Sequence, residues 1–332
     1  MATGLQEAPL DRSGAAPGKI RLFEVCLRDG LQNEAVIVPT EAKIAIAHAL
    51  VDAGFRDIEV TSFVRPRWVP QLADATEVIR GLPDAPGVRF WALVPNAIGL
   101  DRALDAGVKN ICTFLSASES HNLKNVNRTV RESLHDARKV IDTAKAGGMS
   151  VRSYVSTSFG CPFEGAVDPA RVAELAGELR AAGADEVALG DTTGMAHPSQ
   201  LEPTLARVID AGVPLDAIAL HFHDTRGTAL VNVWASMALG VTRFDGAISG
   251  VGGCPYAPGA AGNASTQDLV HLLERLDGAQ EPPEGFGPVT GVDLGRLGEI
   301  GRTLEELLGR ELPGRYHQFW QGHQKRRQAR SA

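Results

Sequence analysis

The chain has 332 residues, 44% of them hydrophobic, and 33 Lys and Arg against 40 Asp and Glu give a formal net charge of −7. This composition is typical of a globular protein with a sizeable core, and the acidic balance argues against nucleic acid or a membrane surface as a partner. No apolar run approaches the roughly 20 residues of a membrane span and the N-terminus lacks an apolar signal core, so we expect a cytoplasmic protein.

Residues 1–18 are rich in Ala, Gly and Pro and are predicted to form a disordered tail. From residue 19 to 276, eight β-branched runs alternate with Ala-rich amphipathic stretches. The expected strands are Ile20 to Leu27, Asp57 to Thr61, Val88 to Val94, Asn110 to Leu115, Val151 to Thr157, Glu186 to Gly190, Ala217 to His223 and Arg243 to Ser249.

Seven glycines stand where a helical pattern stops before a strand, as expected for left-handed residues that end helices. They are Gly54, Gly81, Gly107, Gly148, Gly183, Gly212 and Gly240, separated by 27, 26, 41, 35, 29 and 28 residues. Most of these spacings are close to the length of one strand, one helix and their loops. Eight strands that are each followed by a helix predict a (β/α)8 TIM barrel. A doubly wound open sheet is the alternative, disfavoured because no G-x-G-x-x-G follows the first strand.

The barrel is followed by a C-terminal helical extension, predicted over residues 277–310 and opened by a Pro- and Gly-rich stretch. Residues 311–332 form a basic tail that ends in HQKRRQARSA. We expect this tail to be solvated and disordered, and the alternative is that it helps to bind an anionic ligand.

Metal-ligand residue types gather at the predicted carboxyl ends of the strands, where the active site of such a barrel forms. His221 and His223 end the seventh strand, and residues i and i+2 of a strand point to the same face. Asp29 follows the first strand and Asn263 follows the eighth. Two imidazoles and a carboxylate suit a divalent cation, with Asn or water completing the shell. The alternative is that one histidine is a hydrogen-bonded core residue.

Three further polar residues fall at the same strand ends. Arg28 stands beside Asp29, and its guanidinium could hold a developing enolate or carboxylate oxygen, or simply form a salt bridge that closes the barrel. Glu59 lies near the end of the second strand and Asp191 follows the sixth.

The loop over residues 250–265 resembles a flexible lid, because it holds five glycines and two prolines. Its thiol, Cys254, could donate a proton to a carbanion, and the alternative is a small apolar residue under the lid. Cys161 also precedes a proline, but we expect a structural turn there. All four cysteines lie far apart, as in a protein with reduced thiols.

These motifs together resemble the 3-hydroxy-3-methylglutaryl-CoA lyase family of the DRE-TIM metallolyases. The matching runs, in chain order, are RDGLQNE at 28–34, TSFV.P.WVPQ at 61–71, GCP.EG at 160–165, LGDT at 189–192, H.HDT at 221–225 and GGCPYA.GA.GN at 252–263.

The resemblance implies retro-Claisen cleavage of (S)-3-hydroxy-3-methylglutaryl-CoA to acetyl-CoA and acetoacetate, with Mg²⁺ or Mn²⁺, as in leucine degradation and ketone body formation. Which group removes the hydroxyl proton stays open between Asp29 and His221. The implied roles are metal ligand for Asp29, His221, His223 and Asn263, enolate stabiliser for Arg28, active-site carboxylate for Glu59, substrate-side polar group for Asp191 and lid acid for Cys254.

The second loop departs from the family, which usually has Ser-Pro-Lys where this chain has Arg65-Pro66-Arg67. We expect Arg65 and Arg67 to bind the phosphates of CoA, and the alternative is two solvated arginines.

Other activities to distinguish are cleavage of a related thioester, such as citramalyl-CoA or an isoprenoid-extended 3-hydroxyglutaryl-CoA, and condensation to a 2-alkylmalate-type acid. The expected partners are an acyl-CoA substrate and further copies of the chain, as a dimer or tetramer.

Overall fold

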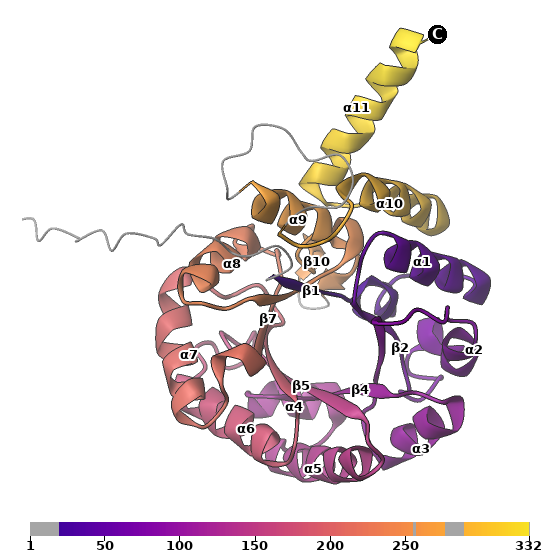
Figure 1. The fold of residues 1–332 in the computed structure, drawn as a ribbon. Coiled ribbons are helices and arrows are strands. Elements are labelled where there is room, and N and C mark those ends of the chain that lie inside the picture. Colours follow the sequence, from indigo (N-terminus) through magenta and orange to yellow (C-terminus); the bar gives the residue numbers. More distant parts are fainter. Residues whose placement is uncertain (1–19, 255–256, 276–288, 332) are drawn as a thin grey trace, which may run out of the picture.

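Eight parallel strands close into a barrel in chain order, and β1 pairs with both β2 and β8. The computed structural model describes residues 20–254, 257–275 and 289–331. Helices surround the barrel (Figure 1), so the predicted (β/α)8 architecture is confirmed. The barrel strands are β1 (Arg21–Glu24), β2 (Asp57–Ser62), β3 (Arg89–Leu93), β4 (Asn110–Ser116), β5 (Ser150–Ser156), β6 (Glu186–Asp191), β7 (Ile218–Phe222) and β8 (Arg243–Gly246).

One helix or more follows each strand, and two further helices extend the chain beyond the barrel. The extra helix α4 lies between β4 and α5, and an antiparallel pair, β9 (Gly253–Cys254) and β10 (Ala257–Ala261), lies in the loop after β8. The helices are α1 (Thr40–Asp52), α2 (Ala75–Arg80), α3 (Ala97–Ala106), α4 (Glu119–Val126), α5 (Val130–Ala146), α6 (Pro169–Ala181), α7 (Leu201–Asp210), α8 (Ala229–Ala238), α9 (Thr266–Glu274), α10 (Leu294–Leu308) and α11 (Arg315–Ser331).

Helix α5 shows how the sequence specifies these elements. Thr129 and Glu132 form a reciprocal capping box that satisfies backbone N–H groups at the start of the helix. Its buried residues, among them Val130, Ala137 and Val140, recur at helical spacing and pack on the barrel. Among the helices of the described ranges, none is long and apolar enough to cross a membrane.

The first strand is shorter than predicted, because it ends at Glu24 rather than Leu27. The buried Glu24 carboxylate accepts hydrogen bonds from the backbone N–H of Cys26 at 2.9 Å and of Ile248 at 3.0 Å. These bonds turn the chain into a π-helical turn, Cys26–Gly30, which carries the Arg28-Asp29 pair into the barrel mouth.

Of the seven glycines that ended predicted helices, six have a positive φ, and Gly81 does not, with φ −91°. Gly81 packs closely against α1 instead. A Cβ there would lie 2.3 Å from Cδ1 of Ile44 on α1. Its interpretation as a left-handed helix end was therefore wrong.

The C-terminal helices pack beside α9 and α1, and α11 extends away from the barrel (Figure 1). The expected disorder of the basic tail is wrong for residues 315–331, which form α11. The Asp268 carboxylate accepts the first backbone N–H groups of this helix, from Arg315 at 3.0 Å and Tyr316 at 2.5 Å. The predicted N-terminal tail and most of the Pro- and Gly-rich stretch lie outside the described residues, so the domain boundaries stay predictions.

Substitution of Gly301 by Ala should destabilise the packing of α10 on the barrel. A Cβ there would lie 2.3 Å from Ser249 Oγ and 2.7 Å from the buried His317 ring, and such overpacking typically costs about 1–3 kcal/mol. Gly322→Ala on α11 is the matched control, because a Cβ there would meet no atom of the described chain within 4 Å. Urea unfolding should show a loss for Gly301→Ala only, and equal effects of the two changes would contradict this packing.

Candidate metal centre

Three ligand-type side chains meet at the carboxyl ends of the strands. The candidate ligand atoms of Asp29, His221 and His223 all lie within 4.8 Å of one another. His221 belongs to β7, Asp29 to the π-helical turn after β1, and His223 pairs through its backbone with Asn263. The structure therefore gathers three of the four proposed metal ligands at one point, and the backbone of the fourth, Asn263, is paired with that of His223.

The protonation of the two imidazoles favours a cation between them. His221 Nδ1 lies 3.0 Å from the Asp245 carboxylate, which can only accept, so Nδ1 carries the proton. In the neutral imidazole the lone pair of His221 is then on Nε2, which lies 3.1 Å from His223 Nε2. The buried Asn263 Oδ1 has no hydrogen-bond partner among the described residues. Nitrogen lone pairs, a carboxylate and an unpaired amide oxygen are the donor set of a divalent cation, so these residues fit one.

The electrostatics of the cluster also suit a cation. Burial would raise the pKa of Asp29, but Arg28 and the two histidines hold it well below its usual value, so the carboxylate is ionised. Burial, reinforced by His221, lowers the pKa of His223 to about 3, which leaves this imidazole neutral. Burial opposes a charge on His221, yet Asp245 and Asp29 together raise its pKa. A bound metal would displace the proton from Nε2 of His221.

Arg28 is buried between two carboxylates. Its Nε and Nη2 lie 2.7 and 2.6 Å from Glu59 Oε2, and its Nη1 is paired with Asp29. The Tyr154 ring lies 5.7 Å from the guanidinium, and its hydroxyl donates to Glu59 at 3.4 Å. Glu59 thus fixes the guanidinium plane, and both carboxylates share one cation.

Asp191 is fully buried and is bonded on one side only. Its Oδ1 accepts from the backbone N–H of Met195 at 2.7 Å and of Ala196 at 3.0 Å, while Oδ2 has no partner in the part of the chain that the structure describes. Burial raises its pKa to about 7, against the lowering effect of those two bonds. The carboxyl organises the loop after β6, and the substrate-side role expected of it stays a prediction.

A cavity of about 850 Å³ opens from the cluster toward α3, α4 and α5. Arg28, Asp29, His221 and His223 line it, and so does Arg65, whereas Arg67 is exposed and is not part of the lining. This space is large enough for a substantial small molecule. The side chain of Cys254 lies outside the described residues.

The lid base approaches the first loop closely. Gly252 has φ 105°, and a Cβ there would lie 2.8 Å from Asn263 Nδ2 and 3.2 Å from the Gly30 backbone. Only glycine allows the two loops to bring Asn263 and Asp29 to the same point.

Sequence reasoning missed four residues that shape the site: Asp245, Arg152, Tyr154 and Trp68. Inward-facing positions on β5 and β8 could have indicated the first three, since alternate residues of a barrel strand face the interior. Trp68 lines the cavity, and its exposed ring lies 5.2 Å from the Arg65 guanidinium and 5.9 Å from that of Arg67. No sequence signal marked this stacking.

Comparison with known proteins decides the family. The HMGL-like family model matches residues 19–304. The chain belongs to the HMGL-like family. It is 45% identical over 299 residues to hydroxymethylglutaryl-CoA lyase YngG of Bacillus subtilis, covering 90% of this chain and 96% of that protein. The resemblance inferred from the motifs is thereby confirmed.

Further relatives are named for the same activity. The cytoplasmic 3-hydroxy-3-methylglutaryl-CoA lyase of Mus musculus is 44% identical over 87% of this chain and 81% of its own length, and a mitochondrial lyase of Rattus norvegicus is 43% identical over 92% and 91%. An HMG-CoA lyase structure from Acinetobacter baumannii, in complex with coenzyme A and 3-methylmalate, has a TM-score of 0.82 at 38% identity and covers 89% of this chain and 93% of its own. Family and cluster together indicate a divalent metal.

Asp191→Asn should flatten the pH dependence of stability. Because the folded-state pKa is raised, the folded protein keeps a proton that the unfolded chain releases, so the unfolding free energy falls as pH rises from about 4 to about 7. The amide cannot ionise and should remove about 1–3 kcal/mol of this fall. Denaturant unfolding of the metal-free proteins at pH 5 and pH 7 measures it, and parallel profiles for parent and variant would refute the raised pKa.

Proposed function

We propose that the chain catalyses the divalent-metal-dependent retro-Claisen cleavage of (S)-3-hydroxy-3-methylglutaryl-CoA to acetyl-CoA and acetoacetate. The observation that carries this proposal is the Asp29, His221 and His223 cluster, beside Arg28, at the inner end of an 850 Å³ cavity. Membership of the HMGL-like family and the coenzyme A complex of the A. baumannii relative support an acyl-CoA substrate.

Asp29, His221, His223 and Asn263 would hold the cation, which we propose to be Mg²⁺ or Mn²⁺. Such a cation polarises the oxygens of a bound substrate and lowers the pKa of its hydroxyl. Asp29 and His221 both line the cavity and remain the two candidates for the base that removes the hydroxyl proton. Asp191 and Glu59 would act beside them, Asp191 toward the substrate and Glu59 through Arg28.

Arg28 would stabilise the thioester enolate that the broken carbon–carbon bond leaves. A guanidinium has five N–H donors, and Glu59 and Asp29 engage three of them. The rigid pairing aims the remaining donors without reorganisation, which is how preorganised charge lowers a barrier. The alternative from the sequence, a salt bridge that only braces Asp29, is kept open by the same contacts.

Arg28→Gln should therefore lower kcat by at least about 10²–10³-fold, while KM changes far less, since the interaction strengthens mainly as the enolate forms. Steady-state kinetics at saturating Mn²⁺ measure this. If Arg28 only braces Asp29, the variant should lose metal and excess Mn²⁺ should restore turnover. A kcat within tenfold of the parent at saturating metal would exclude the enolate role.

Cys254 would act as the lid acid that protonates the product carbanion. Cys254→Ser should fold normally and cleave far more slowly, because a hydroxyl is a much weaker acid than a thiol of pKa about 8.5. Cys161→Ser is the matched control, since the buried Cys161 Sγ lies 2.9 Å from Ser118 Oγ and a hydroxyl can make the same bond. Unchanged turnover of Cys254→Ser would return this residue to a packing role.

The remaining proposals concern substrate handling and assembly. Arg65, which lines the cavity, and Arg67, which lies beyond it, would bind the CoA phosphates. We also propose a homo-oligomer and a cytoplasmic location, the latter in line with the mouse relative and in contrast with the mitochondrial rat one. Leucine degradation or ketone body formation would use such an activity.

One experiment tests the reaction against its alternatives. The metal-stripped protein is assayed with Mg²⁺, with Mn²⁺ and without metal, on 3-hydroxy-3-methylglutaryl-CoA, citramalyl-CoA and longer branched thioesters, with mass spectrometric detection of acetyl-CoA. We expect metal-dependent cleavage of the first substrate. Preferential cleavage of another thioester, or only condensation of acetyl-CoA with a 2-oxo acid, would replace the proposed reaction.

A further inference from the structure

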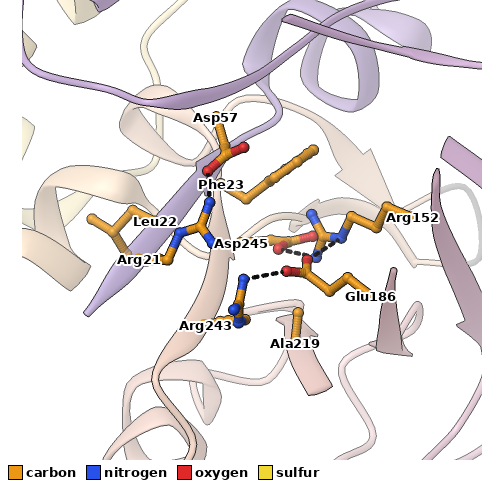
Figure 2. Close-up of a pocket in the computed structure, with 9 residues that line it drawn as sticks. All are labelled: Arg21, Leu22, Phe23, Asp57, Arg152, Glu186, Ala219, Arg243 and Asp245. Atoms are coloured by element: carbon orange, nitrogen blue, oxygen red, sulfur yellow. Dashed lines mark hydrogen bonds and ion pairs between the residues drawn. The ribbon is translucent and has the colours of Figure 1, made fainter. Parts of the chain in front are cut away.

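The barrel interior below the metal cluster is charged rather than apolar. Arg152 on β5, Glu186 on β6 and Asp245 on β8 converge there, together with Arg243 (Figure 2). Arg152 Nη2 lies 2.6 Å from Asp245 Oδ1 and its Nε lies 2.9 Å from Glu186 Oε1. Arg243 pairs with the other Glu186 oxygen at 2.7 Å.

Neither ligand binding nor stability explains this network. The cavity that it lines holds only about 10 Å³, too little for a ligand larger than a water molecule. The Arg152 side chain is 0% exposed and that of Asp245 is 1% exposed, and such buried ion pairs are often no more stable than well-packed apolar residues. The Arg152 guanidinium also lies 3.9 Å from the centre of the Phe23 ring and is thus held in one place.

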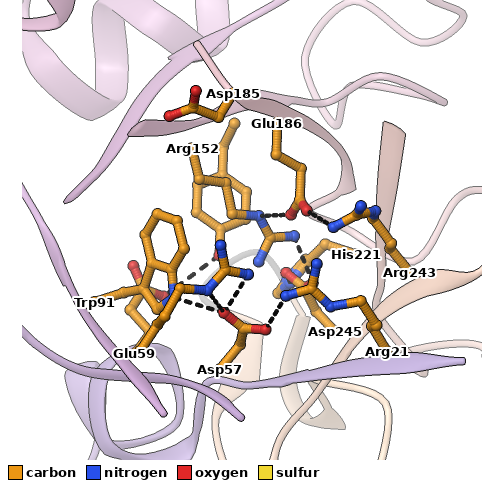
Figure 3. A network of polar contacts seen from close by, with 12 residues as sticks. Arg21, Asp57, Glu59, Trp91, Arg152, Asp185, Glu186, His221, Arg243 and Asp245 are labelled. Atoms are coloured by element: carbon orange, nitrogen blue, oxygen red, sulfur yellow. Dashed lines mark hydrogen bonds and ion pairs between the residues drawn. The ribbon is translucent and has the colours of Figure 1, made fainter. Parts of the chain in front are cut away.

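One hydrogen bond joins the network to the metal cluster. The second oxygen of Asp245, Oδ2, accepts from His221 Nδ1 at 3.0 Å, and Figure 3 shows the two side chains side by side near Arg152 and Glu186. The two oxygens of Asp245 therefore have different tasks, because Arg152 holds Oδ1 and Oδ2 faces the imidazole. With Nδ1 protonated and the ring neutral, as metal binding requires, the lone pair of His221 is on Nε2, which faces His223 and Asp29.

We propose that Asp245, anchored by Arg152, is a positioning residue that fixes the tautomer and ring orientation of His221 for binding a divalent cation. Carboxylate partners of metal-binding histidines typically affect metal affinity by 10- to 100-fold. The inference rests on the metal site of the proposed function, and it assigns the buried ion network a role in building that site.

Glu186 offers a matched comparison within the same network. It contacts the same guanidinium from the other side, and its side chain is 14% exposed, but its ion pairs run to Arg152 and Arg243 rather than to His221. Loss of either carboxylate leaves Arg152 one partner short, so both should cost stability. Only loss of Asp245 should change the imidazole that binds the metal.

The test is Mn²⁺ binding to the metal-free full chain, followed by the electron paramagnetic resonance signal of free Mn²⁺. Asp245→Asn keeps the size of the side chain, but an amide can present either N–H or oxygen to Nδ1 and no longer selects one tautomer. Its Kd should rise about 10- to 100-fold. Glu186→Gln should lower the thermal midpoint and leave the Kd within about twofold of the parent.

A double variant, Arg152→Met with Asp245→Asn, removes both charges and guards against misfolding of the single variant. The double variant should recover the stability that Asp245→Asn loses, but it should bind Mn²⁺ as weakly as Asp245→Asn. An unchanged Kd in both Asp245 variants, or an equal rise in Glu186→Gln, would overturn the positioning role. A parent chain that binds no Mn²⁺ would instead refute the metal site of the proposed function.

Discussion

Closure of the barrel makes eight strands share one narrow interior, so each inward side chain must match those that face it. Most barrels of this type fill that space with branched apolar residues. Here β5 and β8, which are not neighbours in the sheet, place Arg152 and Asp245 opposite each other across the interior. A buried charge needs a partner of opposite charge, so the Arg152–Asp245 pair fixes how β5 and β8 are placed relative to each other. Asp245 also bonds to His221, so the position of His221 on β7 is fixed with them.

At the barrel mouth, side chains suited to bind a cation lie beside a buried guanidinium, which is itself a cation. The ionised Asp29 and the neutral His223 suit a cation, while in the proposed function Arg28 would supply the positive charge that an enolate needs. Glu59 fixes the position of the guanidinium through two contacts to one oxygen, and the same guanidinium also pairs with Asp29. Asn263 Oδ1, which is buried and unpaired within the described ranges, fits a position beside a bound ligand.

The C-terminal extension contacts the start of the loop that follows β8. Ser249 adopts a left-handed conformation, with φ 53°, at the base of the lid, which is a strained arrangement for a residue with a side chain. Gln267 holds it by accepting from its backbone N–H at 2.6 Å, and donates to the Leu297 carbonyl on α10 at 3.0 Å. The Gly314 N–H adds a bond to the Ser249 carbonyl at 2.9 Å. The extension thereby fixes Ser249, where the loop after β8 begins.

The sequence by itself determined the barrel and most of the site. Periodicity and helix-ending glycines such as Gly54 are local signals, and the i, i+2 rule placed His221 and His223 on one face because strand geometry is the same in every sheet. The tertiary structure decided what depends on contacts across the fold. Glu24 ends β1 early by bonding to Ile248, 224 residues away, and thereby brings Asp29 to the histidines. The Asp245 bond to His221 likewise exists only once the barrel is closed, because the charge that anchors it comes from β5 on another side of the interior.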